Sequence, residues 1–274
     1  MQIKAHAKIN WSLRITGKRG DGYHDLETLF QTISLHDTIM IMESDQWLIT
    51  CDDPAVPCDE TNLILRAARA IGPPPLYIAL QKRIPTGGGL GGGSSDAAAT
   101  LLAIDQMFSL HTPAERVREI ALSLGSDVPF FLTGGTAYAT GRGEQLTPLA
   151  AAAPIPLLLV CPHERVATAE AYSQIRNYSR PLGVDRYRAI LADDLLGHED
   201  LLVNDFEEPI FARMPKLREL RDRMSRTGAV WARMSGSGST IVGAFRDQSS
   251  RDAARSAFPD LRTEPAETLS NAAV

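Results

Sequence analysis

One segment, residues 85–96, limits what this chain can fold into more than any other. It reads PTGGGLGGGSSD, with six glycines in the seven positions 87–93, and it runs directly into residues 97–108, whose Ala and Leu content predicts a helix. Glycine lets a backbone adopt positive φ angles and approach a ligand closely. The free N–H groups and positive dipole end of a helix start favour an anion. We therefore predict a phosphate-binding loop, because a flexible linker rarely abuts an apolar helix.

The type of phosphate-binding loop is narrowed by spacing. A Walker A loop requires a Lys after its last glycine, and none follows here. Gly87, Gly89 and Gly92 satisfy G-x-G-x-x-G, but this pattern is weak where glycine is so dense. A dinucleotide-binding fold would place the pattern after the first strand of a repeating βαβ unit, whereas here it lies about a third of the way along the chain. A nucleotide-binding loop of another kind is favoured.

The N-terminal residues 3–15 alternate between apolar and polar side chains. Ile, Ala, Trp and Leu occupy the odd positions, and Lys, His, Asn, Ser and Arg occupy the even ones. A period of two predicts an extended strand with one buried face. Lys8 and Asn10 then project side by side from the polar face. Taken alone, this segment favours a polar face that is simply solvated.

Asp127 stands at a defined place in the predicted secondary structure. Residues 112–115 (TPAE) have the pattern of a capping box with proline at the first helical position, and Gly125 ends the helix. This places Asp127 in the loop just past a helix end. It can orient or deprotonate a hydroxyl group there, or it can be an ordinary turn residue, and the two readings are equally supported by the local pattern.

The order of elements predicts an α+β fold in two domains. Helices and strands mix without strict alternation in both halves, and no fixed repeat is present. Ala and Pro dominate between residues 147 and 156. We predict an N-terminal, ATP-binding domain over residues 1–149 and a C-terminal domain over residues 150–274.

Composition excludes several classes of protein. The net charge of −5 gives no global basic field for nucleic acid or anionic membranes, and no apolar stretch is long enough to span a bilayer. The three cysteines are odd in number and form no C-x-x-C pair. This favours a reducing cytoplasm over a disulfide framework or a zinc cluster. We expect a small-molecule substrate, with no nucleic-acid or membrane partner.

Three ordered motifs resemble those of the GHMP kinases, named for galactokinase and the homoserine, mevalonate and phosphomevalonate kinases. They are AKIN (residues 7–10), the glycine-rich segment and MSGSGST (residues 234–240), and they span nearly the whole chain. The stretch RGDGYHDLETLFQ (residues 19–31) is similar to that of the branch whose substrate is a cytidine diphosphate-linked methylerythritol. NLILRAAR, GSDVPFF and the pair Asn204-Asp205 add to this resemblance.

The resemblance implies ATP-dependent phosphorylation of that alcohol, with Mg²⁺, in a cleft between two α+β domains. It implies that Asp127 acts on the hydroxyl group and that Lys8 lies beside the transferring phosphoryl group. It assigns the cytosine to Tyr23, His24 and Tyr172, and further substrate contacts to Asn10 and Thr168. The ATP-binding residues that it implies are Asn62, Pro85, Thr86, Gly87, Gly88, Gly89, Leu90, Gly91, Gly92, Gly93, Ser94 and Ser95.

The chain departs from the family pattern at two places, and two alternative functions stay open. Asp96 stands where Asn is commoner in the family, and the segment 72–78 is short, which leaves the adenine-side loop undefined. Another GHMP kinase with a different acceptor is one alternative. The other is a nucleotide-binding sensor or NAD-type protein, in which Lys8 and Asp127 would lie far from the glycine loop. The sequence does not decide whether residues 235–239 touch phosphate or only close the cleft.

Overall fold

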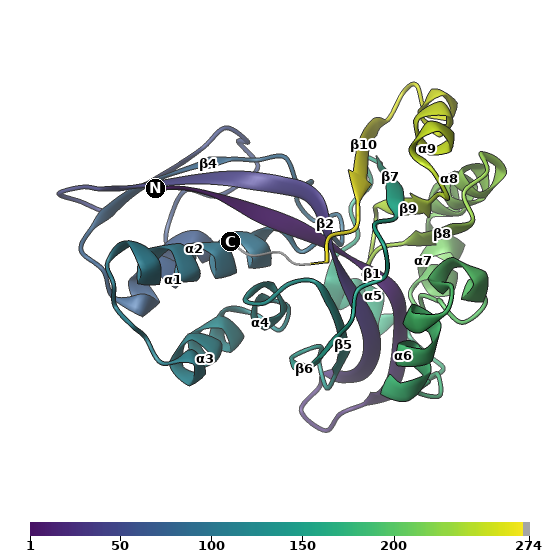
Figure 1. Ribbon diagram of the computed structural model, residues 1–274, viewed down its shortest axis with the longest axis horizontal. Coiled ribbons are helices and arrows are strands. Elements are labelled where there is room, and N and C mark those ends of the chain that lie inside the picture. Colours follow the sequence, from purple (N-terminus) through teal and green to yellow (C-terminus); the bar gives the residue numbers. More distant parts are fainter. Residues whose placement is uncertain (271–274) are drawn as a thin grey trace.

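The structure, a computed structural model, describes residues 1–270, which form two β-sheets with helices packed on each (Figure 1). The first sheet has the strand order β3-β4-β2-β5-β6, with β1 paired to the other edge of β2. Its strands are β1 (Gln2–Lys18), β2 (His24–Glu43), β3 (Leu48–Cys51), β4 (Leu76–Gln81), β5 (Thr136–Thr140) and β6 (Gln145–Leu149).

The long β1–β2 hairpin organises this sheet. The alternation predicted for residues 3–15 is confirmed, since every apolar odd position from Ile3 to Ile15 is buried. The chain that follows forms the single strand β2, which pairs with β1 along its length. On its other edge, β2 pairs with β5 through residues 28–31 and with β4 through residues 38–43.

Four helices lie on one side of this sheet (Figure 1). They are α1 (Leu63–Ile71), α2 (Gly92–Met107), α3 (Ala114–Leu124) and α4 (Val128–Phe131). Helix α2 packs on β1 and β2, and the other three pack on α2. The helix predicted from residue 97 begins earlier, at Gly92, so the end of the glycine-rich segment is the first turn of α2. The predicted capping box is wrong: Pro113 is the N-cap residue of α3, and no side chain caps it. Proline has fixed φ there and carries no capping group.

The second sheet is antiparallel, with the order β10-β7-β9-β8. Its strands are β7 (Pro156–Cys161), β8 (Trp231–Met234), β9 (Ile241–Ala244) and β10 (Arg262–Glu267). The helices of this half are α5 (Thr168–Ser173), α6 (Val184–Ala192), α7 (Glu207–Arg213), α8 (Pro215–Arg226) and α9 (Gln248–Ala254), with the short 3₁₀ turns η1 (Leu195–His198) and η2 (Arg255–Ala257).

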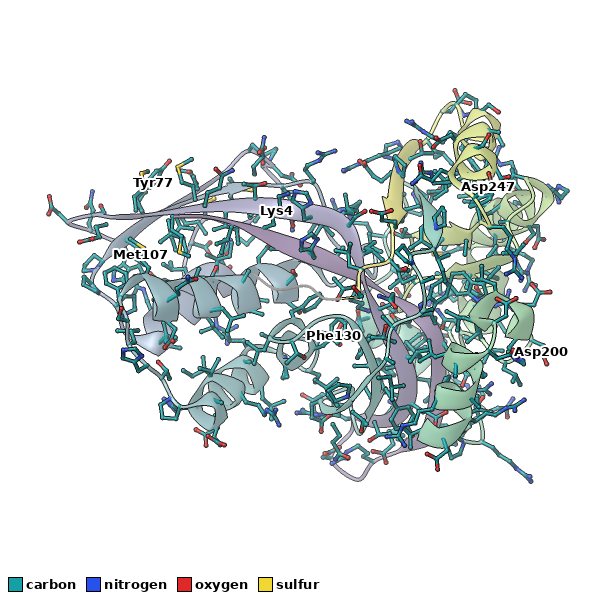
Figure 2. All side chains as sticks on the ribbon, in the orientation of Figure 1. Lys4, Tyr77, Met107, Phe130, Asp200 and Asp247 are labelled. Carbon is teal, nitrogen blue, oxygen red and sulfur yellow. The ribbon has the colours of Figure 1, made fainter. Side chains whose placement is uncertain are left out.

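The two halves share a hydrophobic core. One buried cluster joins Trp11 and Leu29 of the first sheet to Leu159 and Trp231 of the second. Charged side chains such as Asp247 lie at the periphery, whereas Phe130 lies in the interior (Figure 2). β6 ends at Leu149 and β7 begins at Pro156. The predicted division at residue 149 falls next to this connection, and as a domain boundary it stays a prediction.

No helix within residues 1–270 is long and apolar enough to cross a membrane.

Candidate active site

A pocket of about 450 Å³ opens between the two halves of the molecule. Its lining comes from β1 and β2, from the glycine-rich segment, from the N-terminal end of α5 and from the loop between β8 and β9. The residues that were predicted for the site and that line this pocket are Lys8, Asn10, Asn62, Pro85, Thr86, Gly87, Gly88, Gly89, Leu90, Gly91, Gly92, Gly93, Ser94, Asp127, Thr168 and Tyr172.

The loop of residues 235–239 packs against the backbone of the glycine-rich segment. Ser235 Oγ donates to the Gly89 carbonyl oxygen (3.0 Å), and the Thr240 N–H donates to that of Gly88 (3.3 Å). A Cβ atom on Gly89 would lie 2.0 Å from the Ser235 carbonyl oxygen, and the φ of Gly89 is +77°. Glycine is therefore required there by both contact and conformation. The 235–239 loop supports the glycine loop.

The start of α2 is open to an anion. Its N-cap residue is Gly91, which has a left-handed backbone and provides no side-chain cap. The first N–H groups of a helix have no intrahelical acceptor, so they can bind phosphate oxygens. Ser94 lines the pocket, but the Ser95 hydroxyl is buried and donates to the His6 carbonyl oxygen (2.6 Å). Ser95 thus joins α2 to β1, and its geometry does not favour the predicted ATP contact.

Asn62 also has a structural task. Its side chain caps α1 by accepting from the Ile64 N–H (2.8 Å), and it donates to the Pro57 carbonyl oxygen (2.6 Å). These bonds hold the loop before α1 against the pocket, where Pro57 and Asn62 both form part of the wall. Asn62 therefore shapes the nucleotide side of the pocket whether or not it touches the ligand.

Lys8 and Asp127 meet at the end of the glycine loop. Lys8 Nζ lies 3.7 Å from Asp127 Oδ2 and donates to Asn10 Oδ1 (2.7 Å). Asp127 precedes α4 without capping it, and its side chain is 36% exposed, so the carboxylate is accessible from the pocket. The Lys8 N–H donates to the Leu90 carbonyl oxygen (3.0 Å). The sensor or NAD-type alternative required this pair to lie far from the loop, and it does not.

The polar face of β1 is buried at this point. Lys8, Asn10 and Ser12 are 4%, 3% and 1% exposed, so the interpretation as a solvated face is wrong for them. Asn10 Nδ2 donates to Thr28 Oγ1, which donates to the Ser12 carbonyl oxygen. Burial lowers the pKa of Lys8, and the nearby charge of Asp127 opposes this change. The site therefore holds a desolvated cation in a fixed position.

Aromatic side chains lie in and beside the pocket. The rings of His24 and Tyr172 stack, with centroids 5.0 Å apart and planes 19° apart. Tyr23 is 55% exposed, and the guanidinium carbon of Arg142 lies 4.7 Å from its ring centroid. Tyr23 and His24 are not part of the pocket lining, but His24 supports Tyr172, which is. Thr168 shares a hydrogen bond with Ser237 (3.1 Å).

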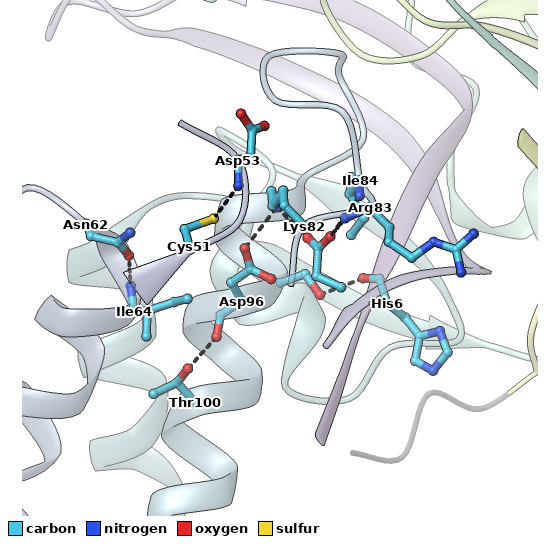
Figure 3. Close-up of polar contacts among 12 residues, drawn as sticks. His6, Cys51, Asp53, Asn62, Ile64, Lys82, Arg83, Ile84, Asp96 and Thr100 are labelled. Atoms are coloured by element: carbon cyan, nitrogen blue, oxygen red, sulfur yellow. Dashed lines mark hydrogen bonds and ion pairs between the residues drawn. The ribbon is translucent and has the colours of Figure 1, made fainter. Parts of the chain in front are cut away.

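Several pocket residues were not predicted from the sequence. Arg142 lines the pocket from the turn between β5 and β6, where its position between two glycines was the available signal. Phe30 lies under Lys8 Nζ, 5.1 Å from its ring centroid. Lys82 and Asp96 also line the wall and form an ion pair (Figure 3). Lys82 follows β4 and Asp96 lies in α2, so no spacing pattern within one helix or strand could have predicted their pairing.

Comparison with known proteins identifies the family. The model of the GHMP kinase N-terminal domain matches residues 62–135, and that of the C-terminal domain matches residues 187–261. This chain is a GHMP kinase. The predicted family, the two-domain α+β fold and the ATP-dependent small-molecule kinase activity are thereby confirmed.

The kinase has curated relatives and solved structures that match along nearly its whole length. It is 40% identical over 271 residues to 4-diphosphocytidyl-2-C-methyl-D-erythritol kinase of Chlorobium chlorochromatii, covering 94% of this chain and 93% of the relative. The same-named enzyme of Salinibacter ruber is 39% identical, with 94% and 95% covered.

Solved structures agree with these relatives. A crystal structure of 4-(cytidine 5'-diphospho)-2C-methyl-D-erythritol kinase superposes with a TM-score of 0.85 at 37% identity, covering 98% of this kinase and 99% of that chain. A homoserine kinase from Cytophaga hutchinsonii has a TM-score of 0.68 at 19% identity, with 96% and 95% covered, and so shares the fold.

Proposed function

We propose that this kinase transfers the γ-phosphoryl group of ATP to the 2-hydroxyl group of 4-diphosphocytidyl-2-C-methyl-D-erythritol, in the non-mevalonate synthesis of isoprenoid precursors. The proposal is supported by relatives of that name that match the chain at about 40% identity over almost its full length. The observation that carries the chemistry is the Lys8–Asp127 pair, which lines the same pocket as the phosphate-binding loop and Tyr172.

ATP binds along the glycine-rich segment in this proposal. Positive φ angles at Gly87, Gly89 and Gly91 turn the backbone so that it can approach the phosphates closely. The N-terminus of α2 adds free N–H groups and the positive end of its dipole. A side chain on Gly91 would meet Phe131 and Lys8, which supports the reading of the segment as a ligand cradle. Asn62 contributes to the nucleotide side.

Transfer requires alignment and charge neutralisation more than covalent help. Lys8, fixed by Asn10 on a rigid strand, stabilises the negative charge of the transferring phosphoryl group. Asp127 accepts the proton of the substrate hydroxyl group as the new O–P bond forms and the bond to ADP breaks, or it orients that hydroxyl group for attack. Mg²⁺ bound with ATP would supply further charge neutralisation and would be held chiefly by the phosphates.

The acceptor occupies the part of the pocket that Tyr172 lines. The Tyr172 ring, supported by His24, offers a flat surface for cytosine, and the exposed ring of Tyr23 is available to a bound cytosine from outside the pocket lining. Asn10 and Thr168 line the same pocket and contact the alcohol portion in this proposal. The proposal places the reaction in the cytoplasm, in keeping with the three unpaired cysteines.

The test is substrate selectivity. Purified kinase is assayed for ADP release with ATP and Mg²⁺ and, in turn, with diphosphocytidyl-methylerythritol, homoserine, mevalonate and galactose. The value of kcat/KM for the cytidyl substrate should exceed each of the others by at least about 10³-fold, because a site built for a cytosine loses that binding energy with the smaller acceptors. Equal turnover with another acceptor would point to a different member of the family.

A further inference from the structure

Three buried ionisable groups form a cluster in the wall of the nucleotide pocket. Lys82 Nζ donates to Asp96 Oδ2 (3.0 Å) and to Asp37 Oδ2. The three side chains are 5%, 3% and 0% exposed, in the order Lys82, Asp96 and Asp37. Two carboxylates therefore share one ammonium group out of contact with water, and the cluster carries a net charge of −1 when all three groups are ionised.

This cluster lies against the start of α2. Lys82 and Asp96 both line the pocket, and Lys82 Nζ lies 2.8 Å from the position that a Cβ atom on Gly92 would occupy. Gly92 is the first residue of α2 and directly follows the loop that cradles the phosphates. Figure 3 shows Asp96 projecting from α2 toward Lys82. Any charge on the cluster is therefore felt where ATP phosphates bind.

The two carboxylates are not equivalent. Asp37 Oδ1 accepts from the N–H groups of Arg83 (2.5 Å) and Ile84 (2.7 Å). Asp96 Oδ1 is buried and has no hydrogen-bond partner among the described residues. Burial, together with the charge of Asp37, raises the pKa of Asp96 to about 8 against the attraction of Lys82. The cluster therefore binds its extra proton on Asp96.

Other groups around Asp96 add little charge. Besides Asp37 on β2 and Lys82, the neighbours are Asp52, which accepts from the Lys82 N–H (2.7 Å), the exposed side chain of Arg83, and Lys8 on β1, which pairs with Asp127. The helices α1, α3 and α4 pack on α2 through apolar side chains, among them Ala67, Ile120 and Phe130. Asp96 is thus the carboxyl group of this cluster whose pKa burial raises.

We propose that Asp96 is a positioning residue whose protonation is coupled to nucleotide binding, so that the pocket takes up a fraction of a proton from solvent when the ATP phosphates bind. Phosphate anions at the start of α2 disfavour a second nearby anion, and the protonated carboxyl group leaves Lys82 paired with Asp37 alone. This inference rests on the proposed function, because it requires ATP in this pocket. An Asn side chain at this position could not ionise.

The direction of the pH effect follows. The Asp96 carboxyl is protonated below about pH 8 in the free kinase and ionises above it. Binding raises its pKa further, so nucleotide affinity should fall as the pH rises through 8. If nucleotide binding raises the pKa of Asp96 by one, Kd at high pH can exceed Kd at low pH by at most tenfold. We expect Kd to increase about threefold to tenfold between pH 7.5 and 9.5.

The experiment is isothermal titration calorimetry of a non-hydrolysable ATP analogue with Mg²⁺, without acceptor, from pH 7.5 to 9.5. Wild type should show the threefold to tenfold rise in Kd. In Asp96→Asn the rise that comes from ionisation of Asp96 should be absent, and only the pH dependence that both proteins share should remain. Titrations near pH 8 in buffers of different ionisation enthalpy should give an uptake of roughly half a proton for wild type and none for the variant. Asp52→Asn is the matched control and should behave as wild type.

Two results would overturn the inference. One is the same pH profile for wild type and Asp96→Asn, since the titration of Lys8 is common to both. The other is the absence of proton uptake when wild type binds the analogue. This measurement uses wild-type protein only, so it holds even if the variant does not fold. The proposed function fails in a different way: the analogue would then not bind at pH 7.5 at all, and both proposals would fall.

Discussion

At the scale of single residues, the reacting pair is defined by distance and burial. Lys8 is desolvated and fixed by Asn10, whereas Asp127 stays accessible at 3.7 Å from the ammonium group. This separation is longer than a hydrogen bond, so a hydroxyl group can approach the carboxylate without first breaking a tight ion pair. The arrangement favours Asp127 as the group that faces the acceptor.

Replacing Asp127 by Asn tests this role. The amide cannot accept the hydroxyl proton, so kcat should fall by roughly 10²-fold or more. Steady-state kinetics measure the loss, and Kd for an ATP analogue should stay within about twofold because the glycine loop is untouched. Asp185→Asn, on the exposed side of α6, is a control that should keep full activity. An unchanged kcat in Asp127→Asn would remove this residue from the mechanism.

Tyr172 belongs to the binding of the acceptor. Tyr172→Ala removes one face of the ring pair, so KM for the cytidyl substrate should rise about tenfold while kcat changes little. A double-mutant cycle with His24→Ala measures the coupling of the two rings. Because they stack, the two effects should be less than additive. A pure kcat effect would contradict the stacking role.

At the scale of elements, the glycine loop depends on a second loop far away in the sequence. The 235–239 loop contacts the backbone of Gly89, and Thr240, directly after the loop, contacts that of Gly88. Asn204 in turn holds this loop, since its Nδ2 donates to the carbonyl oxygens of Met234 (2.6 Å) and Gly236 (2.8 Å). The three motifs of the family thus form one supported unit.

Two alanine substitutions distinguish the packing of the glycine loop on the 235–239 loop from the general effect of replacing a glycine. Gly89→Ala should clash with the Ser235 carbonyl oxygen and strain a φ of +77°. A loss of roughly 2 kcal/mol or more would lower Tm by about 4–8 °C. Gly93→Ala has its nearest contact at 3.7 Å and lies in the first turn of α2, so its Tm should not fall. Calorimetric melting of both variants checks this; equal Tm values would contradict the packing argument.

At the scale of the whole molecule, both sheets contribute to one core. The rings of Trp11 in β1 and Trp231 in β8 meet edge to face, with centroids 4.8 Å apart, and both side chains are fully buried. A cleft enzyme needs its two halves held in register, because the loop, the lysine and the aromatic pair come from different elements. The shared core provides this.

Trp231→Ala tests the coupling of the halves. Truncating a buried Trp should cost about 3–5 kcal/mol in free energy of unfolding. Because the core is continuous, denaturation followed by far-UV circular dichroism and by tryptophan fluorescence should give one coincident transition in wild type and variant. Trp47→Ala, at a partly buried position outside this cluster, should cost less. Two separated transitions would show that the halves unfold independently.

Features that depend on neighbouring residues could be predicted from the amino-acid sequence. The alternation of residues 3–15 predicted β1, and the run of glycines before α2 predicted a phosphate cradle, because period and backbone freedom are local properties. Only the tertiary structure decided the rest. It buried Lys8, paired it with Asp127, placed residues 235–239 under the glycine loop and joined Asp96 to Lys82 and Asp37. Such contacts join residues remote in the chain, so no periodicity records them and only folding brings them together.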